Sequence, residues 1–156
     1  MKSYPQKPPL TNDELEAFLH SAPIAHLGSL NPDGTIHLAA LWFKYVDGEI
    51  VFGTQDKTSK VRNIKHNPQV TVLIDSEAPP FRGVLVYGQA KLDYEDVVAK
   101  RIAIFEKYMP RENAQQMTMQ LAGDFTPIII RVKPQRVSSY DYAKDGMIEL
   151  GSASAR

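Results

Sequence analysis

FGTQDKTSKVRN, residues 52–63, combines the end of a strand, a short polar loop and the first turn of a helix. β-branched and aromatic residues lead into Phe52, as is typical of a strand. Either Thr58 or Ser59 is suited to be the N-cap of the helix, and Pro68 limits its far end. The segment therefore predicts a strand–loop–helix unit with a helix over residues 59–66.

The loop and the helix that follows it have the chemistry of a phosphate site. No acid occurs from residue 57 to residue 74, whereas Lys57, Lys60, Arg62 and Lys65 are all basic. Free N–H groups at a helix N-terminus, with hydroxyls beside them and a lysine one turn in, suit a phosphate. A solvated basic helix face after a hairpin has the same pattern, so both interpretations stay open on this stretch alone.

Composition places the chain among ordinary single-domain proteins, with 156 residues, 43% apolar and 23% charged. Eighteen basic and eighteen acidic side chains cancel, which argues against a nucleic-acid partner recognised by bulk charge. Without cysteine there is no disulfide framework, thiol nucleophile or thiolate metal site. No apolar run reaches membrane-spanning length, and the polar N-terminus is no signal peptide. We therefore expect a cytoplasmic protein with no membrane or nucleic-acid partner.

Turn residues and apolar periodicity predict the remaining elements. A capping box at Thr11 begins a short helix that we expect to cover one end of a barrel. Strands are predicted at 24–30, 35–43, 49–54, 69–75, 83–92 and 127–133, with a seventh left open at 137–142, and further helices at 94–109 and 111–122. This pattern predicts an α+β fold, mainly an antiparallel barrel of six to seven strands with flanking helices. Residues 1–10 are expected to form a flexible arm, 11–142 the domain and 143–156 a tail.

The strand predicted at 35–43 is apolar on both faces. One face must fill a core, and the other must meet a second layer, a partner subunit or a flat ligand. Ala39 and Ala40 are small enough to let a planar ring approach the backbone. Tight sheet packing explains the same residues and is the better explanation from this strand alone.

No constellation of catalytic side chains is evident. The four histidines, His20, His26, His37 and His66, lack metal-ligand spacing, so no metal site is expected. His26 and His37 are expected at the surface or satisfied in the core, with a small chance that His37 touches a ligand. The serines lack a nucleophile-elbow motif, and no nucleotide-binding glycine loop occurs. An enzyme with this sequence would need a bound cofactor to carry the chemistry.

The sequence resembles the pyridoxamine 5′-phosphate oxidase-like split-barrel family of flavin and deazaflavin proteins. The resemblance covers roughly residues 11–142. No single motif is specific, but the ordered set is. The residues that carry it are HLAALWF at 37–43, DGEIVFGT at 47–54, SKVRNI at 59–64, NPQV at 67–70, PFRGV at 80–84, GQA at 88–90 and IRVKPQRV at 130–137.

The resemblance implies a homodimeric split barrel with each cofactor in a groove between subunits. It implies that the ring system lies along His37, Leu38, Ala39, Ala40 and Leu41. It also implies that Thr54, Lys57, Thr58, Ser59 and Lys60 hold the phosphate with Asn63 nearby, and that Phe81 and Arg82 come from the other subunit. Many relatives carry arginine at the position of Thr58, and Lys57 is expected to supply that charge.

We therefore expect an FMN-dependent oxidoreductase that acts on a small molecule of unknown identity. One alternative is the deazaflavin coenzyme F-420, whose long anionic tail would need an extended basic track such as Arg62 and Lys65 offer. The other is a non-catalytic module that stores or carries the flavin, with a haem-handling protein a distant third. The residues that bind substrate phosphate in true pyridoxamine phosphate oxidases are not recognisable here, which argues against vitamin B6 oxidation.

Overall fold

A computed structural model describes residues 8–123 and 125–144. In chain order the elements are α1 (Asn12–Ser21), β1 (Ala25–Leu30), β2 (Ile36–Leu41), β3 (Lys44–Val46), β4 (Glu49–Gln55), α2 (Ser59–His66), β5 (Gln69–Asp75), β6 (Arg82–Asp93), α3 (Val97–Phe105), α4 (Arg111–Gln120), β7 (Pro127–Asp141) and the 3-10 turn η1 (Tyr142–Lys144). The strands form one antiparallel sheet in the order β2-β1-β5-β6-β7-β4-β3.

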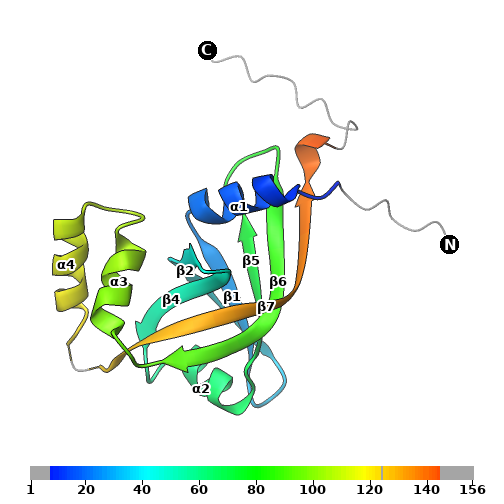
Figure 1. Cartoon of the computed structure of the whole chain (residues 1–156). Helices are drawn as coiled ribbons and strands as arrows, with labels where there is room; N and C mark the ends of the chain where they lie inside the picture. The colour runs from blue at the N-terminus through cyan, green and yellow to red at the C-terminus, as the bar shows by residue number, and fades with distance from the viewer. Residues whose placement is uncertain (1–7, 124, 145–156) are drawn as a thin grey trace.

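The sheet is curled into a half-barrel (Figure 1). Its two edge strands, β2 and β3, are joined by only Trp42 and Phe43. In a flat sheet of this size the edges would lie about 29 Å apart, because neighbouring strands are spaced by about 4.8 Å. A two-residue link spans about 11 Å at most. The sheet must therefore curl until its edges approach one another.

Much of the bend lies in the long β6–β7 pair. The register of this pair shifts between Tyr87 and Gly88. A Cβ atom at Gly88 would lie 2.3 Å from the carbonyl oxygen of Lys133, so only glycine allows the two backbones to come this close. The predicted bend at Gly88 is confirmed.

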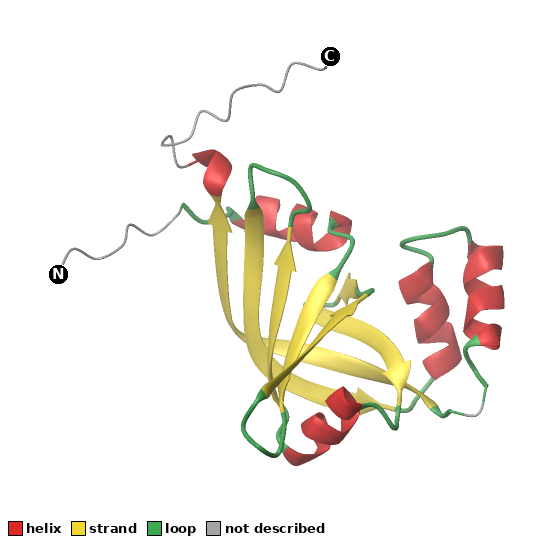
Figure 2. Ribbon diagram, turned by 180° about the vertical axis from the view of Figure 1, so that it is seen from behind, coloured by secondary structure: helices red, strands yellow, loops and turns green. Residues whose placement is uncertain are grey.

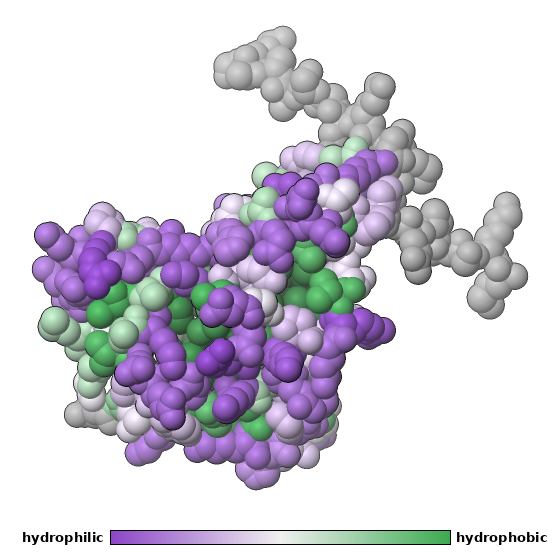
Figure 3. Space-filling model, in the orientation of Figure 1, coloured by the Kyte–Doolittle hydropathy of each residue, from purple (hydrophilic) through white to green (hydrophobic). Residues whose placement is uncertain are grey.

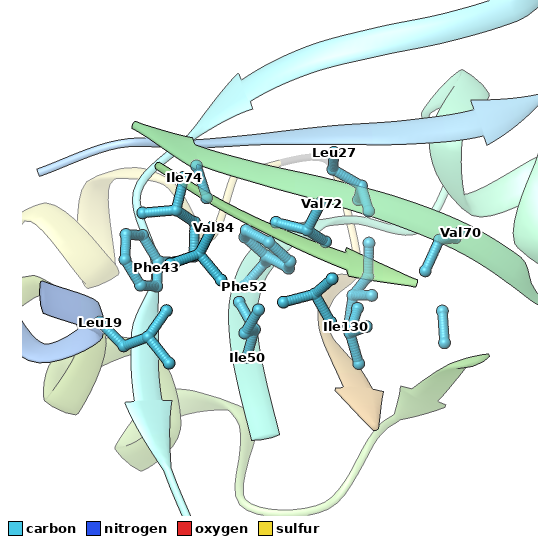
Figure 4. Close-up of a cluster of buried hydrophobic side chains, with 14 of the residues drawn as sticks. Leu19, Leu27, Phe43, Ile50, Phe52, Val70, Val72, Ile74, Val84 and Ile130 are labelled. Atoms are coloured by element: carbon cyan, nitrogen blue, oxygen red, sulfur yellow. The ribbon is translucent and has the colours of Figure 1, made fainter. Parts of the chain in front are cut away.

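The concave side of the sheet contains the main core (Figure 4). Phe43, Ile50 and Phe52 are fully buried there against residues of β1, β5, β6 and β7. α1 covers one end with Phe18 and Leu19, as expected from the sequence, and α2 contributes buried residues to the same core. A smaller core on the convex side seats α3 and α4 on β4 and β7, and Figure 3 shows apolar side chains at the surface in this part of the molecule.

The link between β2 and β3 is held by α3 and the residues that follow it. The Trp42 ring stacks on the Tyr108 ring at 4.6 Å between centroids, with an interplanar angle of 13°. The Tyr108 hydroxyl accepts from the Phe43 N–H at 2.9 Å and donates to the Phe43 carbonyl at 3.1 Å. Burial raises the pKa of Tyr108, so the phenol keeps the proton that it donates.

Most predicted elements are confirmed within one or two residues at each end, including the helix over 59–66, the strand over 69–75 and the capping box at Thr11. Two strand predictions were wrong. A short strand, β3, follows the link and was missed. The separate strands predicted at 127–133 and 137–142 are one continuous strand, β7, because Pro134 lies opposite the bulge at Gly88 and does not interrupt pairing. The helix predicted from residue 94 begins only at Val97, after Asp96 in a left-handed conformation.

The ends of the expected arm and tail, residues 1–7 and 145–156, lie outside the described residues. Residues 8–10 pack on the domain: the Pro8 carbonyl accepts from the Asp141 N–H at 2.9 Å, and Leu10 lies in the core. Among the described residues, no helix has the length and apolarity needed to cross a membrane.

Tyr108→Phe tests the clamp on the link. The change leaves the buried Phe43 N–H without its partner and should lower the free energy of unfolding by about 1–3 kcal/mol. Urea unfolding measures the loss. Tyr94→Phe is the matched control, since Tyr94 is 55% exposed, and it should change stability by less than about 0.5 kcal/mol. Equal effects of the two changes would show that the clamp is not needed.

Candidate functional site

The first turn of α2 presents backbone N–H groups that no side chain caps. Thr58 occupies the N-cap position with extended backbone, as predicted, yet its hydroxyl donates to the Gln55 carbonyl at 3.0 Å instead of capping the helix. No acid lies in the first turn. The N-terminus of α2 therefore keeps its positive potential and its donors for an acceptor from outside the helix.

Lys60 lies in this first turn and is half-buried. Burial lowers the pKa of its ammonium group. Within the described chain it has neither an ion pair nor a hydrogen bond. A half-buried cation without a partner is costly, so an anion placed here would be favoured both by Lys60 and by the helix N-terminus. Lys57, two residues before the helix, is exposed on the same loop.

Arg62, expected from the sequence as part of an extended basic track, also contacts the helix N-terminus. Its guanidinium reaches back and donates from Nη2 to the Ser59 Oγ at 3.1 Å. Arg62 is exposed, so its charge lies at the rim of the same helix terminus. The i,i+3 spacing of Ser59 and Arg62 on a helix is the signal that could have revealed it.

Asn63 fixes α2 to the rest of the fold. It is 4% exposed, and its Nδ2 donates to the Ser29 Oγ at 3.1 Å and to the Asn31 Oδ1 at 2.8 Å. Both acceptors belong to β1 and the turn after it, and Figure 2 shows α2 beside this hairpin turn. Both amide hydrogens of Asn63 are thus used within the protein, which gives it a positioning role for the loop at 57–60.

β2 carries the residues expected along the ring, His37 to Leu41, and it is an edge strand. It pairs with β1 on one side only, so the backbone N–H and C=O groups on its other side have no strand partner in the described sheet. Within one chain one face of this strand stays open, so no second layer of the same chain covers it; coverage by a partner subunit or a flat ligand stays a prediction. Ile36 and Leu38 are each 69% exposed, and Ala40 is exposed beside them.

A groove of about 700 Å³ lies along this exposed face. Its walls come from β1, β2 and β5, with Tyr87 of β6 at one side, and they are mostly apolar. The volume is within the range of small-molecule sites, about 300–1,000 Å³. The polar residues His26 and Asp75 lie in the groove at the start of β1 and the end of β5, whereas Gln69 lies at the end of the groove nearest α2.

Phe81 and Arg82 lie far from the loop at 57–60 within one chain. They precede and begin β6, at the end of the sheet covered by α1, and Arg82 is stacked over the Phe18 ring at 5.0 Å. α2 lies at the opposite end (Figure 1). One chain therefore brings together Thr54, Lys57, Thr58, Ser59 and Lys60, which follow one another from β4 into α2, but not Phe81 and Arg82.

Among the described residues, no group of three or more histidine, aspartate or glutamate side chains is placed to hold a metal ion. The three histidines His20, His37 and His66 are spread over α1, β2 and α2. His26 lies 3.8 Å from Asp75, from Nδ1 to Oδ1. What the site offers is an uncapped helix N-terminus with a half-buried lysine, an open strand edge and an apolar groove.

The sequence model of the pyridoxamine 5′-phosphate oxidase family matches residues 11–141. No curated protein matches the sequence. The match includes the loop at 57–60, α2, β2 and the residues around Phe81, which are the segments that build the site.

Solved structures with the same fold include proteins named for different roles. A conserved hypothetical protein of Mycobacterium tuberculosis is 25% identical with a TM-score of 0.80, over 99% of this chain and 100% of that one. A protein named F420 reductase is 26% identical with a TM-score of 0.63, over 79% and 94%. The haem storage protein of Vibrio cholerae, 15% identical with a TM-score of 0.66 over 83% and 93%, shares the fold alone.

Asn63→Ala should loosen the attachment of α2. The change removes both hydrogen bonds and leaves the buried Ser29 hydroxyl without its donor, so we expect a loss of about 1–3 kcal/mol in unfolding free energy. Asn67→Ala is the control from the end of the same helix, because the Asn67 side chain only accepts from the exposed Gln69 N–H. It should cost less than about 1 kcal/mol. Denaturant titration that gives the same loss for both variants would contradict the positioning role.

Proposed function

The chain belongs to the pyridoxamine 5′-phosphate oxidase-like family, and we propose that it is an FMN-binding oxidoreductase whose cofactor lies between two subunits. The flavin ring, when bound, supplies hydride or electron transfer. The observation that carries the proposal is Lys60: a half-buried cation without a partner in the described chain, in the first turn of a helix that no side chain caps. These residues fit a phosphate dianion.

Each segment of the site would have a separate task. Lys60, Lys57 and the free N–H groups of α2 would hold the phosphate, with the Ser59 hydroxyl and Arg62 at the rim. The open edge of β2 would offer backbone donors and acceptors to the polar rim of the ring. Ala39 and Ala40 would leave room for the ring to lie close to the strand. Asn63 would hold α2 against the hairpin, so that the segments that bind the phosphate and the ring keep a fixed relative position.

A second copy of the chain would complete the site. Phe81 and Arg82 lie at the opposite end of the sheet from α2, so they can join a site at α2 only from another subunit. If two exposed sheet faces pack about a two-fold axis that runs across the strands, opposite ends meet. The partner's Phe81 and Arg82 would then lie near α2. The same packing would cover Ile36 and Leu38 and would roof the groove.

Two alternatives remain as proposals. The neighbour named F420 reductase favours a deazaflavin coenzyme, and Arg62 at the rim of the helix terminus could begin the basic track that its tail would need. FMN is placed first because it needs one compact phosphate pocket, which the loop at 57–60 can form. A carrier that stores the flavin has the same binding site. It differs in that an added electron acceptor would not reoxidise the reduced cofactor at a useful rate.

Side-by-side titration of the purified protein with FMN, the deazaflavin coenzyme and riboflavin tests the proposal. FMN should bind most tightly, and Lys60→Ala should weaken its binding about ten- to a hundredfold. This range corresponds to the loss of a charged hydrogen bond of about 1.5–3 kcal/mol. Lys65→Ala should change FMN binding less than about threefold, since Lys65 is exposed on a later turn.

Riboflavin is the internal control because it lacks the phosphate, and its affinity should hardly respond to Lys60→Ala. Equal losses of FMN binding in the two lysine variants, or equal losses for riboflavin and FMN, would place the anchor elsewhere. A deazaflavin affinity tenfold or more above that of FMN would reverse the choice of cofactor. No binding of any of the three would reject the proposed function.

The dimer is tested by the oligomeric state of two matched variants. Wild-type protein should sediment at about twice 17.5 kDa. Ile36→Glu would place a charge on the face that the second copy is proposed to cover, so it should yield mainly monomer. Val98→Glu, at an apolar site on α3 that is 57% exposed, should stay dimeric. A wild-type monomer at micromolar concentration would contradict the dimer, and a dimeric Ile36→Glu variant would contradict the proposed interface and the shared site.

A further inference from the structure

One histidine of the groove, His26, lies beside a carboxylate. The His26 Nδ1 is enclosed by protein and has no hydrogen-bond partner, and it lies 3.8 Å from the Asp75 Oδ1. The side chain of His26 is nevertheless 41% exposed. Since Nδ1 itself is enclosed, the exposed surface belongs to the rest of the side chain. That surface faces the groove, which His26 and Asp75 both line.

His26 is also the direct neighbour of the strand proposed to carry the ring. In the antiparallel pair of β1 and β2 it lies opposite Ala40, and on its other side it lies opposite Leu73 of β5. Directly opposite residues share a face of the sheet, with Cβ atoms about 4.5–5.5 Å apart. Ala40 has only a methyl group and is exposed. A flat molecule lying over Ala40 would therefore meet the imidazole of His26.

The other groups around the pair do not occupy this position. Tyr87, the other titratable side chain of the groove, lies under the Arg136 guanidinium at 4.0 Å. Burial raises the pKa of the Tyr140 phenol, and the nearby Asp75 carboxylate raises this pKa further. The rest of the wall near His26 is apolar and includes Leu38 and Leu73. Among the groove residues that the structure describes, His26 is thus the one that can both face a ligand over Ala40 and act as a proton donor.

We propose that His26 is the proton donor of the reaction and that Asp75 positions it. The substrate class follows from the groove: an apolar molecule with a reducible carbonyl or conjugated double bond, such as a quinone. When bound and reduced, the cofactor would supply the hydride. The His26 imidazolium gives a proton from Nε2 to the oxygen or carbon that gains charge, and water later restores that proton. This inference rests on the proposed function, which names the reduced cofactor as the source of the hydride.

Binding experiments test the position of His26 without any turnover. The four histidines can be assigned by proton NMR through single His→Gln variants. On addition of FMN, and then of menadione as a quinone probe, the His26 ring signals should shift. Those of His20 should not. His20 is the matched control because it also faces a carboxylate, Glu16, at 3.9 Å, but on α1 outside the groove.

Single-turnover reoxidation of the reduced FMN protein by menadione tests the proton transfer. The rate in wild-type protein should fall as pH rises, because a proton donor acts only in its protonated form. His26→Gln should be about a hundredfold slower and should lose this pH dependence, while its FMN affinity stays within about threefold of wild type. Asp75→Asn should also be slower and should keep a pH dependence. His20→Gln and Glu16→Gln should behave as wild type.

The outcomes separate this inference from the function on which it rests. If FMN does not bind, the proposed function fails. If FMN binds and menadione reoxidises it, but His26→Gln has the wild-type rate and pH profile, the function stands and the proton-donor role is overturned. If the His26 and His20 signals respond equally to both ligands, His26 does not line the occupied groove.

Discussion

The architecture depends on the two residues that connect opposite edges of the sheet. Trp42 and Phe43 join β2 to β3, so the seven strands cannot lie flat. Phe43 is fully buried and its backbone is held by Tyr108, while Gly88 lets the longest strand pair bend. The chain connects the two edge strands of the sheet at one end only. Towards the other end, β2 and β4 have no shared ladder, and α2 packs against the hairpin there. The site is a consequence of this incomplete closure.

In the proposed function, α2 would give the open end a binding site that exists before any ligand arrives. Its position is set by the buried Asn63 and by Val61 and Ile64 in the core, so the N–H groups and Lys60 need little ordering when an anion binds. A preformed site keeps more of its interaction energy as affinity. The ring end is different, because the edge of β2 and its exposed apolar face would be completed by other molecules. The two ends of the proposed cofactor therefore meet surfaces of different rigidity.

Local signals in the sequence were sufficient for most of the elements and for the position of the basic helix, whereas its role as an anion site stays a prediction. Thr58, Lys60 and Pro68 are close in sequence, and the helix they predict is the helix observed. Features that depend on pairing were not accessible in this way. The edge position of β2, the continuity of β7 through Pro134 and the pairing of His26 with Asp75 all join residues distant in the chain. His26 was expected to be a surface or core residue because nothing near it in sequence marks the groove.

The stacked pair at the link also gives the molecule a built-in optical probe. Trp42 is the only tryptophan, so the long-wavelength ultraviolet emission of the protein comes from one place. That place is one residue beyond β2, with the indole clamped flat against the Tyr108 ring. An immobilised indole has few rotational routes to depolarise its emission. A chromophore that absorbs visible light and binds along β2 would lie within a strand's length of this indole. Energy transfer to it would shorten the emission lifetime of the indole. Occupancy of the strand could thus be followed in unlabelled protein by emission lifetime alone.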